Sequence, residues 1–271
     1  MMLERLQYKN HMGEVIDFGK SGIFVGSNDL HDYSWTISKM NGKISSFKHD
    51  VATHSLPVVI FCNTTEEGVA ARNRLMEVAE KDVLAKKPGK IIIGDYYYKC
   101  YITGSKKSQY LSSRRRMEVA LTTTSDEPYW VRENFNSFRK GAASGLDYPH
   151  DYLFDFVSPF SQASLVNTDF TASNFRMIIF GPCSDPTVYV SGHAYVVNCD
   201  AELGEYITID SVAKTVTKTA TDGTITNVFN LRGRDSYIFE KIGSGANTVV
   251  WDGDFGIDIT LLEERSEPKW I

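Results

Sequence analysis

The first half of the chain spaces its apolar residues in ways that are typical of β-strands. Residues 33–38 and 117–122 alternate apolar and polar positions, as half-buried strands do. Residues 56–61 are a continuous apolar run, which predicts a strand covered on both faces. Residues 96–102, rich in tyrosine, have the composition of a further strand. These patterns predict that the first half is largely β.

One segment between these strands has the signals of a helix. Thr64 and Glu67 have the spacing of a capping box, in which each side chain can satisfy a backbone amide of the first turn. From residue 66 to about residue 87 the apolar side chains form one stripe: Val69, Met76 and Val83, flanked by Leu75, Ala79 and Leu84. The sequence Lys-Lys-Pro-Gly at 86–89 ends this pattern. We expect an amphipathic helix that packs on the protein's own sheet.

The second half consists almost entirely of short apolar runs separated by turn residues. The predicted strands are residues 175–181, 187–190, 194–197, 205–209, 214–219, 224–229, 236–242, 248–251 and 255–262. Asp222 and Gly223 are a hairpin signal between two of them. About nine short antiparallel strands are typical of a jelly roll or a related β-sandwich. The predicted fold is therefore mainly β with a single helix.

Charge separates the chain into two parts. The 271 residues carry a net charge of −5, but residues 1–140 have 21 Lys+Arg against 16 Asp+Glu, and residues 141–271 have 8 against 18. This change from +5 to −10 favours two domains, residues 1–140 and 141–271, with a boundary inside 125–152 where glycine and proline interrupt the pattern. We leave open a return of the last few residues to the first domain.

Composition predicts a folded protein in a reducing compartment. Hydrophobic residues make up 42% and aromatic residues 12%, which is enough for a sizeable core. No apolar run approaches the roughly 18 residues of a membrane span, and the first residues lack the apolar core of a signal peptide. The four cysteines are far apart without a Cys-x-x-Cys pair, so we expect free thiols and neither a zinc knuckle nor a redox motif.

Candidate catalytic and metal sites are weak. None of the six histidines has a metal-ligand spacing: His11, His31, His49, His54, His150 and His193. Gly243-Ser244-Gly245 is interpreted as a turn between strands. The segment from Asp252 to Glu263 resembles an EF-hand loop, but Gly256 occupies a liganding position and Ile257 the glycine position, so a strand is favoured. We expect no enzyme activity, no cofactor and no metal.

The basic residues of the first half do not predict nucleic-acid binding. Arg114, Arg115 and Arg116 lead directly into the strand at 117–122, where a position at the edge or end of a sheet is expected. This half is only mildly basic and has no RNP-like or helix-turn-helix signature. Sequence-specific nucleic acid is therefore not an expected partner.

The order of many short elements resembles a known family. In the second half these are Phe-Gly-Pro at 180–182, Gly-His-x-Tyr-x-Val-Asn at 192–198, Gly-Glu-Tyr-Ile-Thr-Ile-Asp at 204–210, and Arg-Ser-Glu-Pro-Lys-Trp at 265–270. In the first half they are Gly-Asp-Tyr-Tyr-Tyr-Lys-Cys-Tyr-Ile-Thr-Gly at 94–104 and Asp-Glu-Pro-Tyr-Trp at 126–130. The chain resembles, over nearly its whole length, the distal tail protein (Dit) family of long-tailed phages and prophages of Gram-positive bacteria.

The resemblance implies an assembly role. It implies an N-terminal belt domain that forms a hexameric ring at the virion tail tip, between the tail tube protein and the tail-associated lysin or tail-tip protein. It implies a C-terminal galectin-like (jelly-roll) β-sandwich that projects outward and can hold a receptor-binding protein or contact a host glycan. Such tails assemble in the bacterial host cytoplasm, and the family supplies no catalytic residues.

A ring of this kind needs a subunit interface, which we expect on strand edges near residues 96–103 and 114–121. The candidate residues are Tyr97, Tyr98, Arg114, Arg115, Arg116 and Met117. Three alternatives remain open. These strands could pair only within one subunit, the protein could be a carbohydrate-binding module that recognises cell-wall glycans, or it could be a hydrolase with two acidic residues that the sequence does not identify.

Overall fold

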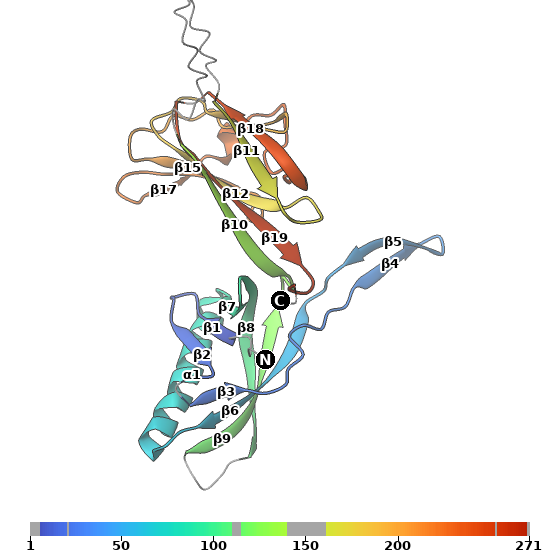
Figure 1. Ribbon diagram of the computed structural model, residues 1–271, viewed down its shortest axis with the longest axis vertical. Helices are drawn as coiled ribbons and strands as arrows, with labels where there is room; N and C mark the ends of the chain where they lie inside the picture. The colour runs from blue at the N-terminus through green and yellow to red at the C-terminus, as the bar shows by residue number, and fades with distance from the viewer. Residues whose placement is uncertain (1–5, 21, 110–114, 140–160, 253, 270–271) are drawn as a thin grey trace, which may run out of the picture. The chain divides into compact units, whose positions relative to one another are not determined.

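The computed structural model describes residues 6–20, 22–109, 115–139, 161–252 and 254–269 (Figure 1). Within these ranges the chain is mainly β with a single α-helix, as the sequence predicts. Two compact units are present. Unit 1 comprises Met1–Arg132 together with Glu264–Ile271, and unit 2 comprises Glu133–Glu263. In the described ranges no α-helix combines the length and the apolar character needed to cross a bilayer.

Unit 1 is built from antiparallel strands and helix α1. The elements are β1 (Leu6–Lys9), β2 (Val15–Phe18), β3 (Ile23–Val25), β4 (Thr36–Met40), β5 (Lys43–Lys48), β6 (Ala52–Phe61), α1 (Thr65–Ala85), β7 (Gly89–Ile93), β8 (Tyr96–Gln109), β9 (Arg116–Ser125) and β10 (Trp130–Phe138). The first part of β8 pairs with β7 and β10, and its second part pairs with β9. Strand β8 therefore belongs to two runs of paired strands, β10-β8-β7-β1-β2 and β8-β9-β6-β3.

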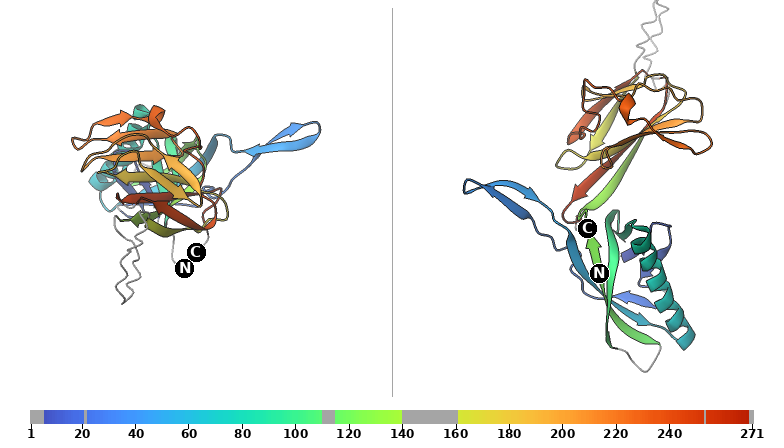
Figure 2. Two further views of the ribbon diagram at one scale, coloured as in Figure 1. Left: turned by 90° about the horizontal axis from the view of Figure 1, so that it is seen from above. Right: turned by 180° about the vertical axis from the view of Figure 1, so that it is seen from behind.

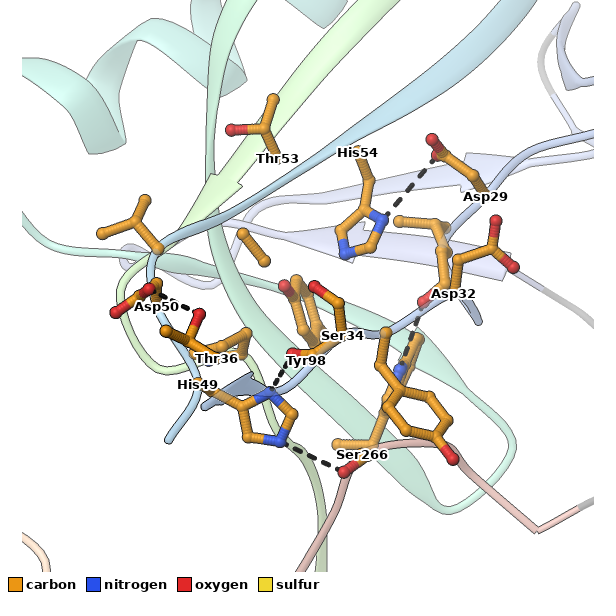
Figure 3. Close-up of a pocket in the computed structure, with 16 residues that line it drawn as sticks. Asp29, Asp32, Ser34, Thr36, His49, Asp50, Thr53, His54, Tyr98 and Ser266 are labelled. Atoms are coloured by element: carbon orange, nitrogen blue, oxygen red, sulfur yellow. Dashed lines mark hydrogen bonds and ion pairs between the residues drawn. The ribbon is translucent and has the colours of Figure 1, made fainter. Parts of the chain in front are cut away.

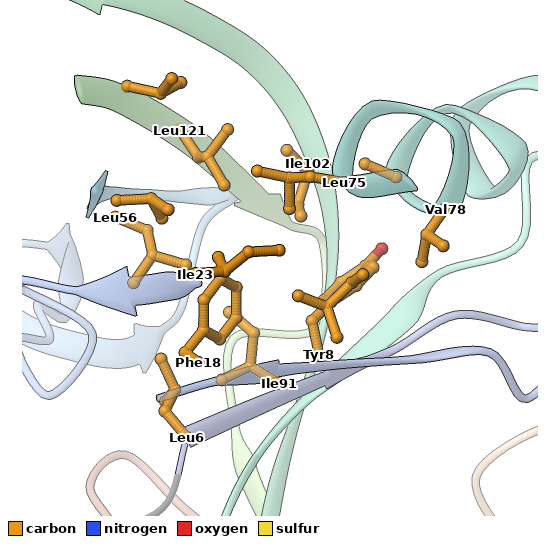
Figure 4. Packing of buried hydrophobic residues seen from close by; sticks show 14 of the residues in the cluster. Leu6, Tyr8, Phe18, Ile23, Leu56, Leu75, Val78, Ile91, Ile102 and Leu121 are labelled. Carbon is orange, nitrogen blue, oxygen red and sulfur yellow. The ribbon is translucent and has the colours of Figure 1, made fainter. Parts of the chain in front are cut away.

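The core of unit 1 lies between these strands and α1, which contacts β8, β6 and β2 (Figure 4). Alternate side chains of β6 enter this core: Leu56, Val58 and Ile60. Between them Val59 is only half-buried, and Phe61 is 56% exposed. The expectation of a strand covered on both faces is therefore wrong. A continuous apolar run does not reveal that only one of its faces meets the core.

The predicted capping box is present at the start of α1. The Thr64 hydroxyl accepts a hydrogen bond from the Glu67 amide, and the Glu67 carboxylate accepts one from the Thr64 amide. The predicted apolar stripe is wrong in part, because Val83 and Leu84 are 40% and 76% exposed. The buried face consists instead of Gly68, Ala71, Leu75, Val78, Ala79 and Asp82. Because this buried face includes the Asp82 carboxylate, a pattern of apolar residues alone does not predict it.

We expect Thr64→Ala to lower the free energy of unfolding of unit 1 by about 1 kcal/mol, because the first-turn amide loses its acceptor. Thr64→Ser keeps the capping oxygen and is expected to retain most of that stability. Urea denaturation of both variants measures the difference. An equal loss in the two variants would show that the cap contributes nothing.

Buried Asp82 joins α1 to the turn after β1. Its side chain is fully buried and accepts hydrogen bonds from the Tyr8 hydroxyl at 2.5 Å and from the His11 amide at 2.9 Å. The His11 ring nitrogen Nδ1 lies 2.5 Å from the same carboxylate. Burial, together with the hydrogen bond to Asp82, raises the pKa of Tyr8 far above its ordinary value. Gly89 completes the site, because a Cβ there would lie 2.4 Å from both Asp82 and Tyr8 oxygens.

Unit 2 is an antiparallel β-sandwich. Its further elements are β11 (Ser161–Asn167), β12 (Asn174–Phe180), β13 (Thr187–Val190), β14 (His193–Val196), β15 (Tyr206–Asp210), β16 (Thr215–Thr219), β17 (Ile225–Asn227), the 3-10 helix η1 (Phe229–Leu231), β18 (Gly245–Trp251) and β19 (Ile257–Arg265). One strand order is β17-β16-β15-β12-β19-β10, and the other is β11-β18-β13-β14. Buried side chains from both orders form one core cluster, which includes Phe175, Val188 and Trp251.

Most of the predicted strands of unit 2 are confirmed. The Asp222-Gly223 hairpin is also present, with the Ala220 amide bonded to the Thr224 carbonyl. The strand predicted at 236–242 is wrong: only Ile242 makes an isolated bridge there, to Ser173. The Asn167 side-chain amide donates a hydrogen bond to the Ile242 carbonyl at 3.0 Å. This side chain supplies a hydrogen bond that a neighbouring strand would otherwise supply. Strand β11 was missed because its sequence, Ser-Gln-Ala-Ser-Leu-Val-Asn, is mostly polar.

Two minor sequence interpretations also agree with the structure. Ser244 forms a bend that leads directly into β18, and the segment that resembled an EF-hand loop enters β19 at Ile257. All four cysteines are free, with Cys62 and Cys100 buried and Cys183 and Cys199 half-buried.

Candidate assembly surface

Strands β4 and β5 form a two-stranded sheet of their own in unit 1 (Figures 1 and 2). The turn between them is Asn41-Gly42, and both residues have positive φ, 52° and 76°. Positive φ at both central positions is the geometry of a type I′ hairpin turn, for which Asn-Gly is the preferred sequence. The cross-strand register pairs Ile37 with Phe47 and Met40 with Lys43. The alternation at residues 33–38 predicts one strand, whereas the Asn-Gly turn joins two, Thr36–Met40 and Lys43–Lys48.

The hairpin exposes an unusual amount of apolar surface. Ile37, Met40, Ile44 and Phe47 are 47%, 68%, 53% and 58% exposed, and no residue of either strand is fully buried. An isolated two-stranded hairpin is marginally stable in water. Exposed apolar patches of this kind usually mark sites of protein association. We define residues 36–48 as the hairpin arm.

The His49 ring connects the base of the hairpin arm to the rest of unit 1 through ring contacts and hydrogen bonds. It lies against Trp35, with 3.9 Å between the ring centroids, and it meets Tyr129 edge-on. His49 Nδ1 donates to the Ser34 carbonyl at 3.1 Å, and Nε2 lies 3.2 Å from the Ser266 hydroxyl. Next to it, the Asp50 carboxylate forms an ion pair with Lys48 at 2.7 Å and accepts a hydrogen bond from the Thr36 hydroxyl. Both interactions lower the pKa of Asp50.

A hollow of about 330 Å³ lies beside this base (Figure 3). His54 Nδ1 lies 3.8 Å from the Asp29 carboxylate in this hollow. The same carboxylate accepts a hydrogen bond from the Ser55 backbone amide. Trp130 and Tyr98 line the hollow with their buried rings. In the described part of the chain, no three His, Cys, Asp or Glu side chains are grouped to hold a metal ion. Among the residues of this hollow, Asp50 contacts the hairpin arm directly, through Thr36 and Lys48.

The strand edges expected to form the interface are already paired within the chain. Residues 96–98 of β8 lie between β7 and β10, and β9 lies between β6 and β8. Tyr98 and Met117, at 2% and 4% exposed, belong to the core of unit 1. In the isolated chain these two side chains therefore present almost no surface to a neighbouring subunit. Alternating patterns identify the buried face of a strand but not the neighbours along its edges.

The other candidate residues that the structure describes have partners within the chain. Lys90 Nζ lies 3.8 Å above the half-buried Tyr97 ring. Arg115 donates to the Asn63 carbonyl at 2.9 Å, and Arg116 pairs with Glu118 at 2.8 Å. Arg114 lies outside the described residues. These contacts use the guanidinium groups that were expected to reach a neighbouring subunit.

The described aromatic residues of unit 2 differ in their exposure. Trp251 and Tyr195 are each 1% exposed and belong to the core. Tyr189 and Tyr237 are 39% and 55% exposed. Burial raises the pKa of the Tyr195 phenol, whose hydroxyl donates to the Glu240 carbonyl.

Comparisons with known proteins identify the architecture. The chain matches no protein-family model and no curated protein. A chain from the structure of the phage P2 baseplate in its activated conformation with Ca has a TM-score of 0.65 at 13% identity, over 98% of this chain and 100% of that one. The corresponding structure with Sr gives 0.64 at 13% identity, again over 98% and 100%.

The crystal structure of SPP1 Dit, described as a paradigm of the hub adsorption apparatus in phages that infect Gram-positive bacteria, has a TM-score of 0.60 at 10% identity. The match covers 96% of this chain and 98% of SPP1 Dit. Nearly the whole chain therefore has the fold of the Dit hub proteins of phage baseplates, which confirms the family resemblance found in its sequence.

Proposed function

We propose that this protein is a structural hub at the tip of a phage or prophage tail and has no enzymatic role. Six copies form a ring that connects the tail tube protein to the tail-associated lysin or tail-tip protein. The hairpin arm carries this proposal: it is an exposed apolar element of a chain with the Dit fold.

The hairpin arm supports ring formation because it needs a partner. Among the described residues its two strands pair only with each other, and four large apolar side chains are exposed to water. A contact between different surfaces of identical subunits closes into a ring when the rotation between neighbours is suitable. Apolar burial supplies most of such a contact, since salt screens exposed charges beyond about 8 Å.

Unit 2 supplies the remaining part of the hub. Its sandwich has a core of its own, which allows its surface to vary without loss of the fold. We infer that unit 2 holds the receptor-binding protein or another baseplate protein. The assembled protein belongs to the virion tail tip, and assembly takes place in the host cytoplasm. The comparisons give no support to the carbohydrate-binding alternative.

Negative-stain electron microscopy and sedimentation velocity of the purified full chain test the proposal. We expect rings with a central hole, with their population increasing with protein concentration. The double variant Ile37→Asp/Phe47→Asp should stay monomeric with an unchanged circular dichroism spectrum, because both side chains lie outside the core.

Ile225→Asp is the matched control, since Ile225 is a comparably exposed strand residue of unit 2. It should assemble like the unmodified chain. A chain that is monomeric at every concentration, or a double variant that assembles normally, would contradict the proposal.

A further inference from the structure

A second hollow of unit 1 is lined by apolar side chains. Its volume is about 630 Å³, and it lies where β3, the end of β6 and the first turns of α1 meet. Phe24 and Phe61, at 43% and 56% exposed, present their rings there, beside Ala70 and Ala71. Gly22 permits this close arrangement, since a Cβ at that position would lie 2.3 Å from the Cys62 sulfur. We define this feature as the Phe24–Phe61 hollow.

The hairpin arm and the Phe24–Phe61 hollow lie at opposite ends of one strand. The arm ends at Lys48 and the chain enters β6 at Ala52, whereas Phe61 is the last residue of β6. A strand rises about 3.3 Å per residue, so the ten residues of β6 span roughly 30 Å. Strand β6 pairs on both edges, with β3 and β9, which makes it a rigid spacer. The arm of one chain therefore does not reach its own hollow.

We propose that the hairpin arm of one copy docks in the Phe24–Phe61 hollow of a second copy. This rests on the proposed function and names the receiving surface of the ring contact. An apolar projection and an apolar hollow at different places on identical subunits make a head-to-tail contact, in which every copy gives one arm and receives another.

The charged side chains around the two surfaces fit this occupant. Lys39 and Lys43 stand on the hairpin arm beside its apolar residues. Glu67 lies on the wall of the hollow, and the neighbouring Glu66 is exposed in the first turn of α1. Arg74 also lines the hollow and carries a positive charge there, and its guanidinium is held by the Val15 carbonyl, to which it donates at 3.2 Å. The arm thus offers cations to a helix start that carries two carboxylates.

Two single variants test the head-to-tail contact in the full chain. Phe47→Asp damages the arm and leaves the hollow intact, whereas Phe61→Asp damages the hollow and leaves the arm intact. Each variant alone should self-associate at least roughly thirtyfold more weakly than the unmodified chain, as loss of a central apolar anchor does. An equimolar mixture should form a dimer and nothing larger, because only one intact arm and one intact hollow can meet. Sedimentation velocity measures all three samples.

The outcomes separate this inference from the proposed function. If Phe61→Asp assembles normally and Phe47→Asp does not, the arm is needed but the hollow is not its receptor. If Phe47→Asp assembles normally, the hairpin arm has no role in assembly and both proposals fail. Thermal unfolding of each variant shows whether a loss of assembly reflects a loss of fold.

Cysteine cross-linking gives an answer even where self-association is weak. We expect a mixture of Phe47→Cys and Ala70→Cys chains to form a disulfide-linked dimer, since Ala70 is an exposed helical residue of the hollow. A mixture of Ile225→Cys and Ala70→Cys chains is the control for random oxidation and for the native thiols. Equal yields from the two mixtures would overturn the inference.

Discussion

Asp82→Ala is expected to lower the free energy of unfolding of unit 1 by about 3 kcal/mol or more. The Asp82 carboxylate is fully buried and accepts hydrogen bonds from the Tyr8 hydroxyl and the His11 amide. Its removal leaves the buried Tyr8 hydroxyl without this partner and opens a cavity under α1. Urea denaturation followed by circular dichroism measures the loss, and hydrogen exchange of peptides from α1 locates it.

Two controls accompany this prediction. Glu80→Ala changes an exposed carboxylate on the same helix and should alter stability by less than about 0.5 kcal/mol. Asp82→Asn keeps the size of the side chain and an oxygen acceptor, so it should cost less than Asp82→Ala. Equal free energies of unfolding for Asp82→Ala and Glu80→Ala would show that the buried contacts of Asp82 make no net contribution to stability.

The stability of unit 1 should fall steeply as pH rises above about 9. Burial raises the pKa of Tyr98 to about 12. Burial also raises the pKa of Tyr8 and of Cys100, each by more than it raises that of Tyr98. These groups hold their protons in the folded state at a pH where the unfolded chain loses them. Each therefore lowers the free energy of unfolding by about 1.4 kcal/mol per pH unit, from its unfolded pKa near 9 or 10 up to its folded pKa.

Urea denaturation at pH 8, 10 and 11 measures this slope. Tyr98→Phe keeps the ring and removes the ionisable hydroxyl, so above pH 10 its slope should be shallower by about 1.4 kcal/mol per pH unit. Below about pH 8 these groups contribute no pH dependence, because they are protonated in both states. A free energy of unfolding that stays constant between pH 8 and 11 would refute the prediction.

The elements that form from local signals were predictable from sequence. The capping box of α1 needs only Thr64 and Glu67, and the hairpin at Asp222-Gly223 needs only its turn residues. The strand predicted at residues 255–262 likewise corresponds to β19, in which Ile257, Ile259 and Leu261 are fully buried. Asn41-Gly42 is a signal of the same kind, and it would have led to the hairpin arm.

Features that depend on distant partners were not predictable from one sequence. Asp82 is buried because Tyr8, 74 positions earlier, donates to it, so the helix face includes a residue that patterning assigns to the surface. Met117 seemed available to a neighbour because the pairing of β9 with both β6 and β8 is not visible in its alternation. The candidate assembly surface was not expected, because the alternation at residues 33–38 predicts a strand but does not show whether either of its faces is covered.

The hydrogen bond between His49 and Ser266 joins residues 217 positions apart in the chain. Because Glu264–Ile271 belongs to unit 1, the ribosome must synthesise all of unit 2 before the base of the hairpin arm gains this contact. Domains generally fold as units during synthesis, with N-terminal parts first. Here the order of translation delays the contact between His49 and Ser266 until unit 2 has been synthesised.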